Sequence, residues 1–175
     1  KKTGGHRPVA VGDILRRLTS KCIAYKVNYP ASQWLRPLQF GVDVRGGCES
    51  IVHATRANLD SPNLSSDSKW CLQVDFENGF NNMDRSSMFC EVRHRLPSIS
   101  AWVESCYKEA SILNFGGGFI LSTAGAHQGD PLAGLLFCSN LHPEKVKGLE
   151  QNSWFQDDGE LMGTKEALVE AWDIL

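Results

Sequence analysis

The chain has 175 residues, of which 42% are hydrophobic and 22% charged, and its formal net charge is −2. This composition is ordinary for a globular domain with enough apolar side chains to bury a core. No apolar run approaches the roughly 20 residues that cross a bilayer, and no secretory signal opens the chain, so we expect an intracellular protein without a membrane partner. Because the chain begins at Lys1 without Met, we also expect it to be cut from a longer protein.

The spacing of the cysteines indicates their chemical state. The six cysteines stand singly, without a C-x-x-C pair, which predicts buried free thiols rather than zinc ligands or disulfides: Cys22, Cys48, Cys71, Cys90, Cys106 and Cys138.

Basic residues gather in the N-terminal stretch, where Asp13 is the only acid before residue 40, whereas the last third is acid-rich. This asymmetry permits a polyanion near the N-terminus, although a basic face that is simply solvated is the more common explanation.

The first sixty residues predict a short strand and two helices. Residues 6–11 are typical of a strand after a glycine entry. Asp13 is placed as the N-cap of a helix that we expect to end near Val27, with one apolar face formed by Ile14, Leu15, Leu18 and Cys22. A second helix is expected after Gly46 and Gly47, and residues 60–68 form a polar loop.

The rest of the chain mixes strands and helices. We expect a strand over 70–76, helices from about 86 and from 97, a hairpin around the glycines 116–118, a helix over 131–142, a hairpin over 153–163 and a last helix capped by Thr164. The strands and helices do not alternate regularly as in a doubly wound sheet. The sequence therefore predicts the α+β class.

The first chemical motif is Val-Asp-Phe-Glu-Asn-Gly-Phe-Asn-Asn-Met-Asp-Arg over 74–85. Asp75 ends an apolar strand, where a carboxylate is costly unless it is exposed or paired. Phe80 follows five residues later.

The second motif is Gly-Ala-His-Gln-Gly-Asp-Pro-Leu over 125–132, a tight turn that enters a helix. Asp130 is a credible N-cap, and Pro131 is suited to the first helical position. The helix dipole and the unpaired N–H groups there favour an anion such as phosphate.

The third motif contains the adjacent carboxylates of Asp157 and Asp158, followed by Gly159. Asp-Gly between two strand-like runs predicts a tight hairpin turn with both aspartates at its tip. Adjacent carboxylates repel each other unless they bind a cation or point into water. Taken alone, the pair is consistent with an exposed acidic turn. Combined with Asp75, it can bind two divalent cations about 3.5–4 Å apart, the arrangement used for in-line displacement at phosphorus.

These three motifs, in this order, resemble the palm of reverse transcriptases, most closely those of non-LTR (LINE-type) retrotransposons. Asp75 and Phe80 match the first palm motif, and Gln128, Gly129, Pro131 and Leu132 match the Gln-Gly-x-Pro-Leu motif. Phe155, Asp157 and Asp158 match the aromatic-x-Asp-Asp motif. The resemblance covers nearly the whole chain and implies a right-hand polymerase palm, an antiparallel sheet with helices packed on one face, plus partial fingers.

The resemblance also implies the catalytic chemistry. Asp75, Asp157 and Asp158 would hold two Mg²⁺ ions, or Mn²⁺, because hard cations prefer oxygen ligands. One ion would lower the pKa of the primer 3′-hydroxyl and the other would stabilise the leaving pyrophosphate. The partners would be an RNA or DNA template with its primer and deoxynucleoside triphosphates.

Further residues receive roles from the same resemblance. Phe80 would exclude the 2′-OH of a nucleotide, although a core aromatic is the alternative. Gln128 and Gly129 would let the backbone approach the incoming nucleotide, although an ordinary capped turn is the alternative. Arg7 would clamp the triphosphate with its planar fork. Arg16 and Arg17 are competitors for that role, or would track the template backbone.

The predicted function is RNA-directed DNA polymerase, with residues 1–68 as a fingers-like portion and 69–175 as a palm-like portion that lacks the thumb. Gln156 is unusual in an apolar strand, and Glu77 and Gly79 replace residues typical of the family. One alternative is therefore a decayed or truncated retroelement copy that only binds nucleic acid. Another is an RNA-directed RNA polymerase, against which Phe80 argues.

Overall fold

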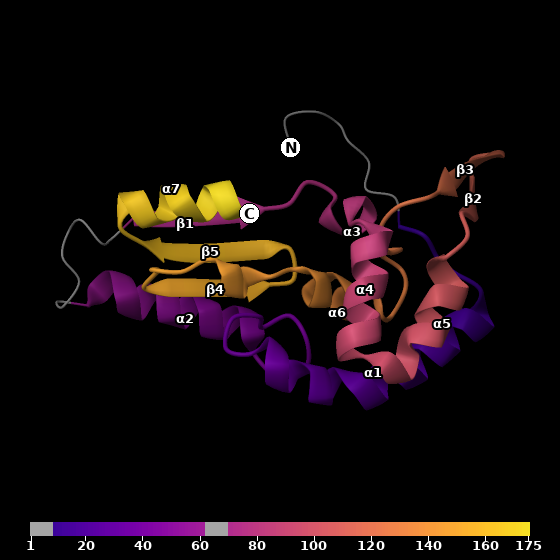
Figure 1. Ribbon diagram of the computed structural model, residues 1–175, viewed down its shortest axis with the longest axis horizontal. Helices are drawn as coiled ribbons and strands as arrows, with labels where there is room; N and C mark the ends of the chain where they lie inside the picture. The colour runs from indigo at the N-terminus through magenta and orange to yellow at the C-terminus, as the bar shows by residue number, and fades with distance from the viewer. Residues whose placement is uncertain (1–8, 62–69) are drawn as a thin grey trace. The chain divides into compact units, whose positions relative to one another are not determined.

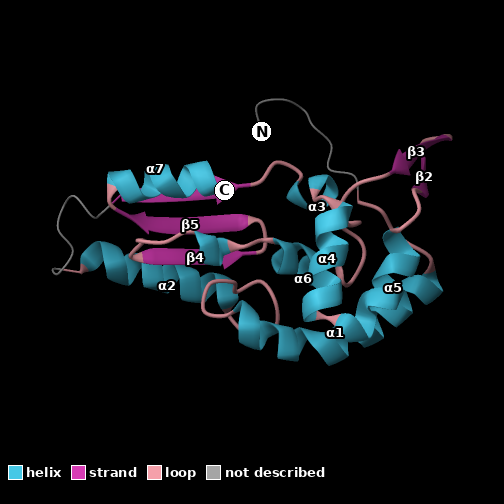
Figure 2. Cartoon of the chain, in the orientation of Figure 1, coloured by secondary structure: helices cyan, strands magenta, loops and turns pink. Residues whose placement is uncertain are grey.

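The computed structural model describes residues 9–61 and 70–175 of the chain (Figure 1). Its helices and strands are, in order, α1 (Ile14–Leu35), α2 (Gly47–Asp60), β1 (Trp70–Asp75), α3 (Gly79–Asn82), α4 (Arg85–Arg95), α5 (Pro97–Tyr107), β2 (Ser111–Phe115), β3 (Gly118–Ser122), α6 (Ala133–Asn140), the 3₁₀ turn η2 (Pro143–Lys145), β4 (Gln151–Phe155), β5 (Asp158–Gly163) and α7 (Lys165–Ile174). Helices are mixed with antiparallel strands, as Figure 2 shows, and the predicted α+β class is confirmed.

The chain forms two compact units, and each combines an early and a late stretch of sequence. The first unit contains the described residues up to Lys26 together with Glu77–Asn140, and the second contains Val27–Phe76 and Leu141–Leu175. These units are defined by contacts, and each draws on residues from both sides of position 68. The assignment of 1–68 to fingers and 69–175 to palm therefore stays a prediction.

The second unit is built on a three-stranded antiparallel sheet with the strand order β1-β5-β4. On one face, α7 packs against β1 and β5. The core of that face is apolar and contains Val74, Val146, Trp154, Leu161, Leu168 and Ala171. The prediction placed helices on one face only, and α2 adds cover on the other. There Gln151 of β4 accepts a hydrogen bond from Asn58 and donates one to Thr55, both 2.9 Å long.

The first unit is mainly helical, and α4 packs against α5 and α6. Its buried side chains include Met88, Val92, Val103, Tyr107, Leu132 and Leu136. The predicted helices from about 86 and from 97 are confirmed as α4 and α5, and the predicted glycine-centred hairpin is confirmed as β2–β3. Both strands of that hairpin expose apolar side chains, among them Phe115 and Phe119.

Helix α1 differs from its prediction in length and in its buried face. Asp13 caps its start as predicted, since its Oδ1 accepts the N–H of Leu15 at 2.8 Å. The helix continues past Val27 and through Pro30 to Leu35. Ala31 is fully buried, and tertiary packing of this kind overrides a local helix-breaking signal.

The apolar face predicted for α1 was wrong. Ile14, Leu15 and Leu18 are 57–77% exposed, and Cys22 is exposed as well. The helix instead buries Leu35 at its end and, along its length, small side chains, which let neighbouring elements approach its backbone: Ser20, Ala24, Ala31 and Ser32.

Three other expectations have clear outcomes. Val9–Val11, the described part of the strand predicted over 6–11, has no strand structure. All six cysteines are free, as predicted, but only Cys138 is buried and four are exposed. No helix of the described residues is long and apolar enough to span a membrane.

Gly159 lies inside strand β5 and not in a turn, so the predicted Asp-Gly turn was wrong. It pairs with Val74 on one side and with Trp154 on the other. A Cβ atom at position 159 would lie 2.6–2.9 Å from three atoms of the fully buried Trp154 ring. The glycine is therefore required by the packing of the tryptophan and not by a turn.

We expect Gly159→Ala to lower the free energy of unfolding by about 1–3 kcal/mol, because the added methyl group forces the Trp154 ring out of its position. Urea titration followed by tryptophan fluorescence measures the change. Gly118→Ala is the matched control, since a Cβ atom there lies no closer than 3.7 Å to a neighbour. Equal stabilities of the two variants would contradict this account of Gly159.

Candidate active site

Asp75 and Asp158 face each other across the two strands β1 and β5. Asp75 is the last residue of β1, Asp158 is the first residue of β5, and the antiparallel register pairs them directly. Directly opposed residues project from the same face of a sheet, with Cβ atoms about 4.5–5.5 Å apart. Both residues are exposed, so water, an ion or a substrate can reach them.

Asp157 lies one residue earlier, in the two-residue turn that joins β4 to β5. Phe155 pairs with Asp158, so the turn consists of Gln156 and Asp157. The prediction that both aspartates lie at the tip is correct for Asp157 only. Gln156 is a turn residue with φ 57°, and not the member of an apolar strand that the sequence indicated.

The carboxylates fit a divalent cation only in part. Asp75 and Asp158 supply hard oxygen donors on one face of the sheet, as Mg²⁺ or Mn²⁺ requires. Over residues 9–61 and 70–175, however, no group of three or more His, Cys, Asp and Glu side chains is arranged to hold a metal ion. The geometry therefore supports two ligands and does not gather Asp157 with them.

A neighbouring carboxylate on the same face, Glu160, has structural partners. Its Oε1 accepts a hydrogen bond from the Cys71 thiol at 2.8 Å, and its Oε2 accepts one from the Gln73 amide at 3.1 Å. Cys71 is exposed, but partial desolvation of its thiol and then the hydrogen bond to Glu160 raise the pKa of the thiol to about 12. This thiol therefore stays protonated and acts as a donor.

The Gln128–Gly129 turn belongs to the first unit and approaches the segment before α1 very closely. A Cβ atom at position 129 would clash with the carbonyl oxygen of Ala10. Glycine at this position is therefore needed for the contact between the two backbones, whatever else approaches the turn. Gln128 beside it is partly buried.

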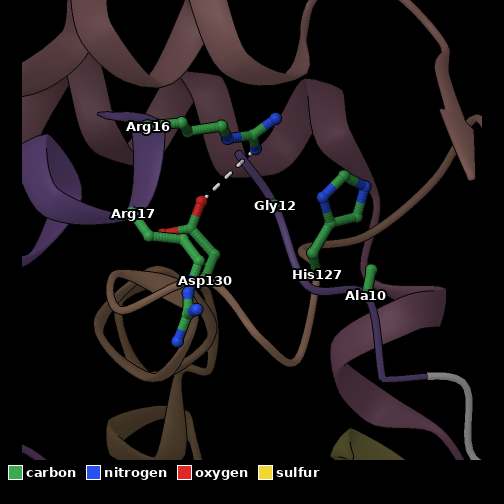
Figure 3. A pocket seen from close by; sticks show the side chains of 6 residues that line it. All are labelled: Ala10, Gly12, Arg16, Arg17, His127 and Asp130. Atoms are coloured by element: carbon green, nitrogen blue, oxygen red, sulfur yellow. Dashed lines mark hydrogen bonds and ion pairs between the residues drawn. The ribbon is translucent and has the colours of Figure 1, made fainter. Parts of the chain in front are cut away.

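The start of helix α6 carries an anion of its own, the carboxylate of Asp130. Its Oδ1 accepts the N–H of Leu132 at 3.0 Å, and its Oδ2 accepts the Tyr107 hydroxyl at 2.8 Å. Its Oδ2 also pairs with the Arg16 guanidinium at 3.3 Å (Figure 3). The predicted anion-binding helix start is thus satisfied internally by Asp130.

Arg16 lines a small pocket with Asp130, and the ring of Tyr107 links it to a second arginine. The pocket is lined by Ala10 and Gly12 before α1, by Arg16 and Arg17 of α1, and by His127 and Asp130 (Figure 3). The guanidinium groups of Arg16 and Arg85 lie 4.8 and 5.4 Å from the centre of the Tyr107 ring. Burial and then Asp130 raise the pKa of the Tyr107 hydroxyl, which therefore remains a hydrogen-bond donor.

Arg85 ties together the segment that leads to the Gln128–Gly129 turn. Its buried guanidinium donates to the carbonyl oxygens of Tyr107, Ala124 and Gly125 and to the Ser122 hydroxyl, at 3.0–3.3 Å. A buried guanidinium needs several hydrogen-bond acceptors, because a buried charge without partners is very costly. Arg85 therefore fixes the backbone of the segment that leads to the Gln128–Gly129 turn.

Phe80 lies in the core of the first unit. It is 8% exposed, and its ring stacks on Phe137 with centroids 4.8 Å apart. This packing is the alternative that the sequence left open for Phe80. Its role at the nucleotide sugar stays a prediction.

The arginines with predicted substrate or nucleic-acid roles have different environments. Arg7 lies outside the described residues. Arg16 is partly buried and committed to Asp130, whereas the neighbouring Arg17 is exposed. Arg17 is thus better placed than Arg16 to contact a phosphate from solvent.

Comparison with known proteins decides the family. The model of the family described as "Reverse transcriptase (RNA-dependent DNA polymerase)" matches residues 1–152. The chain belongs to the reverse transcriptase family. The match includes Asp75, Phe80 and the Gln128–Gly129 turn and ends shortly before Asp157. No curated protein matches the chain.

The sequence did not reveal the partners that hold these reverse transcriptase motifs in place. Arg85 ends the first palm motif, and a basic residue directly after a helix-capping aspartate, Asp84, was the available signal. Tyr107 and Gln39 offered none, because Tyr107 bonds to Asp130, 23 residues away, and Gln39 bonds to Gln156, 117 residues away. Such long-range hydrogen bonds do not follow from local patterns.

The buried His127 makes the stability of the reverse transcriptase chain depend on pH. Burial, then Arg16 and Arg85, lower its pKa below 6.5 in the fold, although Asp130 opposes the shift. As the pH falls below 6.5, the unfolded chain takes up this proton before the folded chain, so stability is lost until the pH passes the lower folded pKa.

We therefore expect His127→Gln to lose less stability than the unmutated chain when the pH is lowered from about 8 to about 5. Urea midpoints at each pH measure this difference. His94→Gln, an exposed histidine of the same unit, should keep the full pH dependence. Parallel curves for His127→Gln and the unmutated chain would show that the shift of the His127 pKa is absent.

Proposed function

We propose that this reverse transcriptase chain is the catalytic core of an RNA-directed DNA polymerase of the non-LTR retrotransposon type. It would transfer a deoxynucleotide from a deoxynucleoside triphosphate to the 3′-hydroxyl of a primer. The observation that carries the proposal is the direct pairing of Asp75 with Asp158 in a chain of this family. Two carboxylates from distant parts of the sequence meet on one exposed face.

In this proposal the three aspartates hold the divalent cations, Mg²⁺ or Mn²⁺, that the reaction requires. Such cations supply charge neutralisation at the reacting phosphate and activation of the attacking hydroxyl. Asp75 and Asp158 would supply carboxylate oxygens from the sheet face, and Asp157 would supply one from the turn. The carboxylates contribute mainly by positioning, because phosphoryl transfer depends on orientation and charge neutralisation more than on covalent catalysis.

The remaining assignments place nucleotide and nucleic-acid contacts on the first unit. Phe80 would contact the nucleotide sugar through whichever ring edge its stacking on Phe137 leaves open. Gln128 and Gly129 would present backbone to the incoming nucleotide. Arg17, which is exposed, is the stronger candidate for the template backbone, and Arg16 would act through Asp130. Arg7 is proposed to clamp the triphosphate on sequence grounds alone.

A second candidate function is nucleic-acid binding without catalysis. It is favoured by one observation, that the described residues gather no three metal-binding side chains at one point. A chain that has lost this geometry could keep its basic residues and its fold. Extension activity separates the two candidates.

Primer extension on an RNA template in Mg²⁺ tests the proposal. We expect incorporation of deoxynucleotides in preference to ribonucleotides. Asp75→Asn and Asp158→Asn should each lower the rate at least about a hundredfold, because each removes a negative charge that would bind a divalent cation. Glu160→Gln is the matched control on the same strand and face, and it should retain most of the activity.

Several results would count against the proposal. Preferential use of ribonucleotides would indicate an RNA-directed RNA polymerase. Full activity of Asp157→Asn or Asp158→Asn would contradict the metal-binding assignment. Primer–template binding without extension would support the second candidate.

A further inference from the structure

Gln39 is a fully buried amide that bonds to the turn between β4 and β5. It follows α1 in the second unit, the same unit as the turn, and is 1% exposed. Its Oε1 accepts the backbone N–H of Gln156 at 2.8 Å, and its Nε2 donates to the carbonyl oxygen of Gln156 at 3.2 Å. The same Oε1 accepts the N–H of Gly41 at 2.9 Å. One side chain therefore satisfies both backbone groups of a single turn residue.

Gln156 needs this support because its backbone is in a strained conformation. Its φ of 57° lies in the left-handed region, where glycine is the usual residue of a tight hairpin turn. Such a conformation persists only where the surroundings determine it. The two hydrogen bonds from Gln39 fix the orientation of both peptide groups of Gln156.

The segment that carries Gln39 is itself anchored to strand β4. Phe40 donates to the carbonyl oxygen of Trp154, and Trp154 donates to that of Leu38, both at 2.7 Å. At Gly41 a Cβ atom would lie 2.6 Å from both the backbone nitrogen and the Cγ of Gln156. The segment 38–41 is thus in close contact with β4 and with the turn, and a shift of Gln39 would require a shift of β4.

We propose that Gln39 is a positioning residue for the aspartates of the β4–β5 hairpin. Asp157 follows Gln156 directly, and Asp158 pairs with Asp75 one residue later. The backbone angles of Gln156 therefore set the direction in which Asp157 leaves the turn and in which the chain enters β5 at Asp158. Gln39 touches no reacting atom and acts through this turn. The inference rests on the proposed function, in which these aspartates bind divalent cations.

The test compares two buried glutamines of the same unit in the full chain. Gln39→Met keeps the length of the side chain and removes its three hydrogen bonds. Gln151→Met is the matched control, because Gln151 is also buried and bonds to Asn58 and Thr55 at the opposite end of β4. Gln39→Glu is a second variant, which keeps an acceptor for the two N–H groups if Gln39→Met does not fold.

Two readouts are measured, amide hydrogen exchange of the turn and the affinity for Mn²⁺ by electron paramagnetic resonance. We expect Gln39→Met to accelerate exchange at residues 155–158 and to weaken Mn²⁺ binding about ten- to hundredfold, as loss of a residue that orients metal ligands does. For Gln39→Glu, both the exchange rate and the Mn²⁺ affinity should lie between those of Gln39→Met and those of the unmutated chain. Gln151→Met should leave the exchange of the turn unchanged and alter Mn²⁺ affinity by less than about twofold.

The proposal is overturned if Gln39→Met leaves exchange at the turn unchanged, or if it accelerates exchange without weakening Mn²⁺ binding more than Gln151→Met does. The second result would assign Gln39 a purely structural role. If the unmutated chain binds no Mn²⁺, the proposed function loses its metal site. Exchange at the turn then decides by itself whether Gln39 holds the hairpin.

Discussion

The pairing of β1 with β5 is the constraint on which the second unit depends. It joins two strands whose opposed aspartates are 83 residues apart in the sequence, and β5 then pairs with β4 on its other side. The apolar face of the same three strands is covered by α7 and by the Trp154 ring, which packs on Gly159 near the start of β5. The register that buries the core therefore also places Asp75 opposite Asp158. A shift by one residue would turn the apolar side chains into solvent.

In the first unit, buried polar contacts hold the Gln128–Gly129 turn in position. Tyr107 lies near two arginines, donates to Asp130 and accepts the N–H of His127. A fully satisfied buried network of this kind defines one arrangement, since breaking any member leaves another group unpaired. The Gln128–Gly129 turn is therefore held by Arg16 of α1, Arg85 of α4 and Tyr107 of α5, all in the same unit. The closeness of Ala10 to Gly129 shows how little space that arrangement leaves.

Local patterns were sufficient for much of this fold and for the order of its motifs. Helix α2, strand β1 and the caps at Asp13 and Thr164 follow from short-range periodicity and capping, which depend on neighbouring residues. The β4–β5 turn was misplaced because Gly159 was interpreted through its conformational freedom, whereas the structure needs its lack of a side chain beside Trp154. The burial of Gln39 could not be predicted, because its partner Gln156 lies 117 residues further along the chain.

In the proposed function, the paired Asp75 and Asp158 form a binding site for a divalent cation. Anomalous diffraction from crystals grown with Mn²⁺ tests it most directly. We expect an anomalous peak bound by carboxylate oxygens of both residues, at about 2.0–2.6 Å, the range of oxygen ligands around hard divalent cations. An ordered peak elsewhere, with the carboxylates of Asp75 and Asp158 turned away from each other, would contradict it.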